Sequence, residues 1–179
     1  MCGIVGLHLR NPDLHPRLGE MLAGMLGEMQ DRGADSAGIA VYGNPTWAPP
    51  GHGCISLLEL DVLPDEVSTT LGAALGVPVA AQTIDVTLVA SAPAPADELL
   101  AAARAAYPQA LVAGFGSDLT VLKGVGAPRD LTESWGLAAA SGWQGVGHTR
   151  MATESAVTSS GASTSWAPSR SSRCTPLIV

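Results

Sequence analysis

An apolar run that begins at the second residue places the start of this chain inside its own core. Cys2–Leu9 reads Cys-Gly-Ile-Val-Gly-Leu-His-Leu, and the polar, proline-containing segment Arg10–Asp13 ends the run. A short apolar run that stops at a turn predicts a buried β-strand. We therefore expect the chain to begin inside its own sheet.

A helix with a Leu and Met stripe is predicted next. Its apolar residues recur at spacings of three and four: Leu18, Met21, Leu22, Met25, Leu26 and Met29. We expect this helix to begin near Pro16 and to stop at Gly33. Gly19, Gly24 and Gly27 lie inside it, and each costs about 1 kcal/mol relative to Ala. Tertiary packing must therefore hold the helix, or another segment must approach its backbone closely.

The rest of the chain alternates short strands and helices. We predict strands at Ala37–Tyr42, Ile55–Leu60, Val86–Ala90, Ala110–Phe115, Leu119–Leu122 and Trp143–Arg150, and helices at Asp65–Leu75 and Ala96–Ala106. Residues 155–179 hold eight Ser, no Asp or Glu, and no periodic apolar face before the last three residues. They are typical of a low-complexity or out-of-frame tail, expected to be disordered.

Charge and cysteine usage narrow the classes of function. Nine basic against sixteen acidic residues give a net charge of −7, which disfavours nucleic acid and anionic membranes as partners. Three cysteines without a CxxC pair argue against a disulfide framework or a structural zinc site. No signal peptide, bilayer-spanning stretch or nucleotide or metal motif is found. We expect a reduced, cytoplasmic protein without metal or cofactor.

Cys2 is the most informative residue. Removal of Met1 would leave a thiol and a free α-amine on one residue, so that the nucleophile carries its own base. The α-amine has an ordinary pKa of about 7.7–8.0, and enough of it is neutral near pH 7 to accept the thiol proton. The alternative is that Cys2 is a small buried residue of an edge strand.

Two further segments carry polar groups that could form a site. Asp31–Gly38 follows the predicted helix and could present backbone donors and a carboxylate, or could be a structural turn. Gly145–Glu154 contains Arg150, whose guanidinium suits an α-carboxylate, while nearby oxygens could accept from an α-amine. His148 in that segment is typical of a packing histidine.

Taken together and in this order, these segments resemble class II glutamine amidotransferases, whose glutaminase domain is an N-terminal-nucleophile hydrolase. The resemblance rests on residues 1–6, on Arg32–Gly38 and on Gly147–Thr153, and it covers residues 1–154. Met151 with Glu154-Ser155 looks closest to the glutamate-synthase-related amidotransferase subunits. The resemblance implies an α+β fold, a four-layer α/β/β/α sandwich.

The resemblance also implies a reaction. Cys2 would attack the side-chain amide of glutamine, Arg150 would bind the substrate α-carboxylate, and Thr153 would lie in the same pocket. Glutamate and ammonia would be the products, with the ammonia passed to a separate synthase subunit. No cofactor and no metal are implied.

The chain departs from this family after residue 154. The family's Asn-Gly oxyanion hole and a later acidic residue that holds the substrate amine have no counterpart, since the asparagines are Asn11 and Asn44 and nothing acidic follows Glu154. We hypothesise a truncation or a change of reading frame near residues 156–160, which would leave the sandwich incomplete. A non-catalytic glutamine-binding or regulatory fragment is therefore one alternative. Another N-terminal-cysteine amidase, such as an acylase, is a second, although Arg150 favours an amino-acid substrate.

Overall fold

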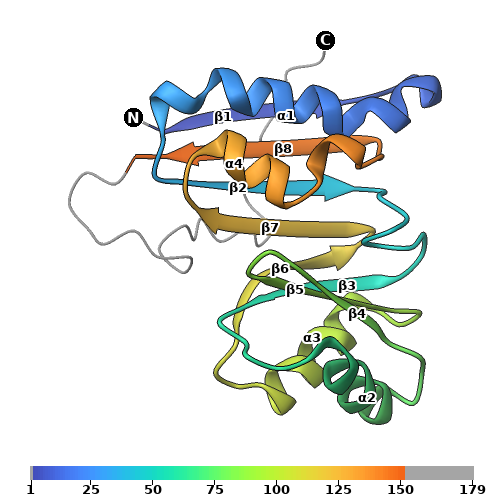
Figure 1. Cartoon of the computed structure of the whole chain (residues 1–179). Coiled ribbons are helices and arrows are strands. Elements are labelled where there is room, and N and C mark those ends of the chain that lie inside the picture. The colour runs from blue at the N-terminus through green and yellow to red at the C-terminus, as the bar shows by residue number, and fades with distance from the viewer. Residues whose placement is uncertain (1, 152–179) are drawn as a thin grey trace, which may run out of the picture.

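The computed structural model describes residues 2–151, which form two antiparallel sheets with helices packed against each (Figure 1). The first sheet, sheet A, has the order β1 (Gly3–His8), β8 (Gln144–Arg150), β2 (Ser36–Tyr42) and β7 (Leu119–Val125). The second, sheet B, has the order β4 (Ala80–Ile84), β5 (Thr87–Ala92), β3 (Gly53–Leu58) and β6 (Leu111–Ser117). Helices α1 (Leu18–Glu28) and α4 (Pro128–Ser134) lie against sheet A, and α2 (Pro64–Leu75) and α3 (Ala96–Ala106) against sheet B.

Sheet A and α1 share a core made by the predicted apolar stripe. Leu18, Leu22 and Leu26 are each fully buried in it. They can approach the sheet because β8 presents glycines to the helix: a Cβ at Gly145 would lie 2.9 Å from Leu22, and one at Gly147 2.8 Å from Leu26. The glycines of β8 therefore leave the space that the Leu side chains of α1 fill.

Sheet B has a separate aliphatic core with α2 and α3. Its fully buried members include Ile55 from β3, Val67 and Leu71 from α2, and Leu99 from α3. Burial of side chains of this size contributes roughly 1.5–3 kcal/mol each. Two such cores let a chain with few aromatic residues build two helix–sheet layers.

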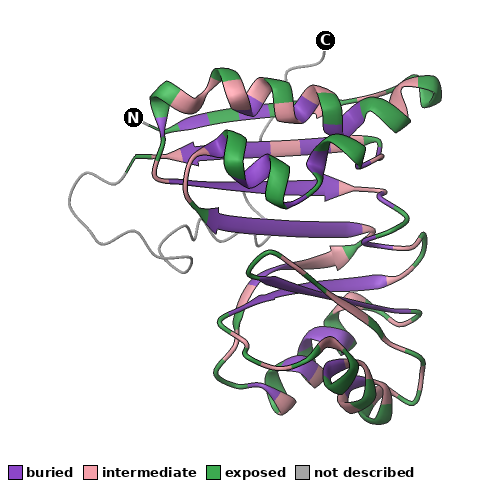
Figure 2. Ribbon diagram, viewed as in Figure 1, coloured by how far each residue is buried: buried purple, intermediate pink, exposed green. Residues whose placement is uncertain are grey.

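The sheets meet along β7. The turn between β6 and β7 has Asp118 at φ 55°, and the backbone N–H of Val121 donates to Ser56 Oγ of sheet B at 3.1 Å. A small cluster joins the sheets here: Ala40, Leu58, Ala113, Leu119 and Val121. Sheet B does not reach the opposite edge of sheet A, formed by β1 (Figure 2). Ile4 on that strand is 70% exposed.

Most of the predicted elements are confirmed, but the first strand, expected to be buried inside its sheet, is the edge strand β1, whose alternate residues are exposed. The helix at Ala96–Ala106 has the predicted bounds, and the α+β class is confirmed, whereas the four-layer stacking stays a prediction. The sequence did not indicate β4 or α4. The first helix ends at Glu28 rather than at Gly33, because a 3-10 turn at Gln30–Arg32 comes between them.

The predicted tail at 155–179 lies outside the described residues, as do Met1 and Thr153. Within residues 2–151, no helix combines the length and the hydropathy needed to cross a bilayer.

Candidate functional site

The strand register brings the three singled-out segments to one end of sheet A. Gly3 at the start of β1 pairs with Thr149 near the end of β8, and Ser36 at the start of β2 pairs with Arg150. Ser36 also pairs with Val125 at the end of β7. Cys2 directly precedes Gly3, so continuing the register by one residue sets it opposite Arg150. The two residues that the sequence predicts as nucleophile and carboxylate-binding group thus lie just before β1 and at the end of the neighbouring strand β8.

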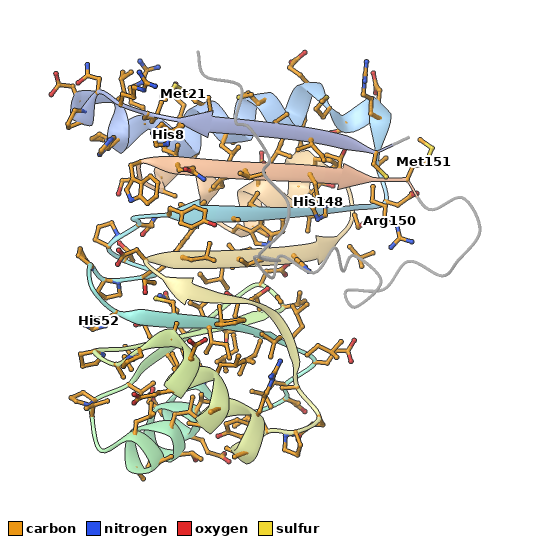
Figure 3. All side chains as sticks on the ribbon, turned by 180° about the vertical axis from the view of Figure 1, so that it is seen from behind. His8, Met21, His52, His148, Arg150 and Met151 are labelled. Carbon is orange, nitrogen blue, oxygen red and sulfur yellow. The ribbon has the colours of Figure 1, made fainter. Side chains whose placement is uncertain are left out.

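Strand alternation places these side chains on the face of sheet A that α1 does not cover. Gly145 and Gly147 face α1, so His148 and Arg150 face the other way. Figure 3 shows His148 and Arg150 from that side. Ile4 pairs with His148 and is exposed on this face, and Cys2, two residues earlier, follows the same alternation. The thiol of Cys2 is free and the residue exposed.

The Asp31–Gly38 segment fixes the end of β8 through its backbone. The N–H of Asp35 donates to the carbonyl of Arg150 at 3.2 Å, and the N–H of Gly126 donates to the carbonyl of Asp35 at 2.9 Å. A Cβ at Gly33 would lie 2.6 Å from the backbone nitrogen of Arg150. Because backbone atoms cannot move aside cheaply, glycine is required here. The backbone of this segment therefore forms a structural turn, one of the two alternatives considered from the sequence. The turn positions Arg150.

A buried basic pair lies on the same face as Arg150. Lys123 on β7 is 3% exposed and His148 on β8 is 9% exposed, and both pair with Gly38 of the strand between them. Burial lowers the pKa of Lys123. Burial, and then the charges of Lys123 and Arg150, lower the pKa of His148. Sequence reasoning missed Lys123 because the predicted strand stopped at Leu122, and a Lys just past a strand is typical of a solvated end.

The two asparagines hold turns elsewhere. The Asn11 side chain accepts from the N–H of Asp13 at 3.1 Å, and the Asn44 side chain accepts from the N–H of Thr46 at 2.9 Å and of Trp47 at 3.1 Å. No asparagine of the described range 2–151 is thus an oxyanion-hole donor beside Cys2.

A cavity of about 420 Å³ lies beside β7 and α4, with Asp85, Val125 and Asp130 in its wall. Strands β8 and β2 separate it from β1. The part of the chain seen here brings no three metal-ligating side chains together.

Comparison with known proteins gives one informative likeness. No protein-family model matches the chain. The chain is 40% identical over 168 residues to the glutamine amidotransferase-like protein GlxB of Rhizobium meliloti (strain 1021), and the match takes in 90% of this chain and 54% of that protein. The chain thus spans about half the length of this curated relative.

Proposed function

Because this likeness supports a glutamine amidotransferase family for the chain, we propose that it is a glutaminase of the class II type with Cys2 as its nucleophile. The observation that supports the proposal is the register of sheet A: the exposed Cys2 directly precedes Gly3 of β1, and Gly3 pairs with Thr149, the residue before Arg150 on β8. The substrate is glutamine, and the products are glutamate and ammonia.

The proton transfers of this reaction need only the thiol and the α-amine of Cys2, which Met1 removal makes available. The α-amine of Cys2 takes the thiol proton, and Sγ attacks the side-chain amide carbon of glutamine. The C–N bond of the tetrahedral intermediate then breaks, and ammonia leaves with a proton from the ammonium of Cys2. Water cleaves the resulting γ-glutamyl thioester and releases glutamate.

Arg150 orients the substrate in this scheme. A guanidinium binds a carboxylate through two parallel hydrogen bonds. An extended glutamine separates its amide carbon from its carboxyl carbon by about one strand spacing, roughly 5 Å. A glutamine carboxylate held at β8 therefore leaves the amide at β1, within reach of Cys2. Thr153 is assigned to the same pocket by the family resemblance.

The released ammonia goes to a separate synthase subunit in this proposal. The proposal that the chain is a class II glutaminase also includes a four-layer α/β/β/α sandwich. It further includes a relationship to the glutamate-synthase-related amidotransferase subunits.

A second candidate is a non-catalytic glutamine-binding or regulatory fragment. The positions of Asn11 and Asn44 favour it, because neither side chain can stabilise a tetrahedral oxyanion beside Cys2. Loss of one oxyanion donor typically lowers kcat by about 10²- to 10³-fold. The two candidates share the binding site and differ in turnover.

The test is hydrolysis of glutamine by the purified chain, with intact mass recorded first to establish that Met1 is removed. We expect equimolar glutamate and ammonia, and loss of both in Cys2→Ala. Cys54→Ala is the matched control, because Cys54 is buried on β3 of the other sheet. Retention of Met1, or unchanged turnover in Cys2→Ala, would refute the mechanism. Glutamine binding without turnover would select the second candidate.

A further inference from the structure

We propose that Lys123 and His148, which flank Gly38, bind the substrate carboxylate together with Arg150, and that Lys123 selects amide substrates that carry a negative charge. This inference rests on the proposed function and names what its site recognises.

The geometry is a row across three strands. Gly38 on β2 pairs with His148 on one side and with Lys123 on the other. A Cβ at Gly38 would lie 2.9 Å from His148 Nε2 and 3.3 Å from Lys123 Cγ. Both side chains therefore lean over the glycine from opposite sides. The missing side chain at Gly38 leaves the space that the His148 ring and the aliphatic part of Lys123 approach.

Within residues 2–151, the two basic groups are buried without an acidic partner. His148 Nε2 is fully buried and makes no hydrogen bond within residues 2–151. Neither His148 nor Lys123 pairs with a carboxylate in this part of the chain. Buried cations in proteins are normally paired, because their desolvation is otherwise uncompensated. A lysine and an imidazole that have no acidic partner among the described residues are thus suited to binding the anionic group of a ligand.

The position of the pair matches the substrate already proposed. His148 precedes Arg150 by two residues on β8, so both face the same side of the sheet. A glutamine with its amide at Cys2 carries its carboxylate about one strand spacing away, roughly 5 Å, toward β8 and β2. The side chain of Lys123 reaches over β2 from the far side. A carboxylate has about four lone-pair sites and can accept from a guanidinium, an ammonium and an imidazole together.

Selectivity follows from this arrangement. Bound glutamine would compensate the buried charge of Lys123, whereas a neutral amide of the same shape would leave that charge unpaired. Sites built to hold a polar group reject analogues that lack it far more strongly than apolar pockets reject a missing methylene.

The experiment measures binding of L-glutamine and of its neutral analogue L-glutamine α-amide by calorimetry. The full chain carries Cys2→Ala, so that no turnover occurs, and is compared with and without Lys123→Met. We expect Lys123→Met to weaken glutamine binding by about tenfold and to leave binding of the α-amide within about twofold. Arg104→Met, in the last turn of α3, removes the same charge far from the site and should change neither affinity.

Thermal unfolding of the same variants separates recognition from packing. If Lys123 recognises a ligand, replacing a buried unpaired cation by an apolar chain of similar length raises the melting temperature of the free protein. Lys123→Gln, which keeps a polar head but no charge, replaces the Met variant if that variant aggregates. Equal loss of affinity for both ligands, no loss for glutamine, or a lowered melting temperature with both affinities reduced would each overturn the inference.

Failure of the inference is distinguishable from failure of the proposed function. Glutamine turnover that Lys123→Met leaves unchanged overturns the inference alone. Charge-dependent glutamine binding without any turnover overturns the hydrolytic function and keeps the inference. A chain that binds no glutamine overturns both.

Discussion

Gly19 and Gly24 lie in the same helix, α1, and the structure predicts opposite effects for the same substitution. Gly24 is exposed, and a Cβ there would meet no atom within 4 Å. Gly19 is buried, and a Cβ there would lie 1.9 Å from the carbonyl oxygen of Leu137 and 2.6 Å from that of Ala140. Gly19→Ala and Gly24→Ala therefore form a matched pair, equal in chemistry and different in surroundings.

The expected magnitudes follow from two opposing contributions. Each substitution gains about 1 kcal/mol of helix propensity. At Gly19 the new methyl group also forces the segment around Leu137 away from α1 and strains the hydrogen bond from the Gly19 N–H to the Ala140 carbonyl, 2.9 Å long. Overpacking costs typically 1–3 kcal/mol and a lost hydrogen bond about 1 kcal/mol. We therefore expect Gly24→Ala to stabilise by about 1 kcal/mol and Gly19→Ala to destabilise by about 2 kcal/mol.

The assay is thermal and urea unfolding of the two variants beside the parent chain. For a domain of this size each kcal/mol shifts the melting temperature by roughly 2–4 °C. Gly24→Ala should raise it by about that amount, and Gly19→Ala should lower it by roughly 4–8 °C. If Gly19→Ala matches or exceeds the parent in stability, then α1 does not pack on the Leu137 segment as described.

Further predictions concern the thiols, the imidazole and strand β8. Burial raises the pKa of the Cys54 thiol to about 11. Iodoacetamide at pH 7.5 should therefore label Cys2 in the native protein and leave Cys54 unmodified, which peptide mapping would show. Labelling of both thiols would contradict the burial of Cys54. Because the folded-state pKa of His148 lies below its ordinary 6.5, the free energy of unfolding should be highest above pH 6.5 and decrease as the pH falls below that value. In urea titrations, His148→Gln should make the free energy of unfolding less dependent on pH. Gly147→Ala, whose Cβ would lie 2.8 Å from Leu26, should lower stability by about 1–3 kcal/mol in the same titrations.

Local patterns predicted the elements that have strong local signals. The Ala- and Leu-rich segment between Pro95 and Pro108 forms a helix with the predicted bounds. Pro95 favours the start of the helix, and Pro108 prevents it from continuing. Strand β4 has no buried residue and no apolar alternation, so nothing in its sequence distinguished it from a loop. Helix α4 is seven residues long, too short for a helical period to show.

The glycines of α1 show the same limit at the level of single residues. From the sequence, the helix that contains these three glycines was expected to be held by packing or by a close approach to its backbone. The structure shows such an approach at Gly19 and none at Gly24. Close approach depends on which segment arrives from elsewhere in the chain, and no local pattern records that.

The candidate site depends still more on long-range pairing. Cys2 and Arg150 are brought together by the β1–β8 register across most of the chain length, and only the family resemblance joined them beforehand. Lys123 joins them through a second pairing, between β7 and β2. A register is set by the hydrophobic faces of all strands at once, so a single strand's sequence cannot reveal its neighbours.

Strand β8 shows how packing and chemistry share one short segment. Its odd positions, Gly145 and Gly147, have no side chains, which lets Leu22 and Leu26 of α1 pack closely against the sheet. Its even positions, His148 and Arg150, face away from that helix and carry the polar groups of the candidate site. Because the period of a strand is two, neither set constrains the other directly. The close packing of α1 on the odd face nevertheless fixes the backbone from which the even side chains project, so the helix core gives the site its rigidity. A change at Gly147 should therefore act on stability first and on binding only through the displaced backbone, whereas a change at Lys123 should act on binding and leave the packing of α1 intact.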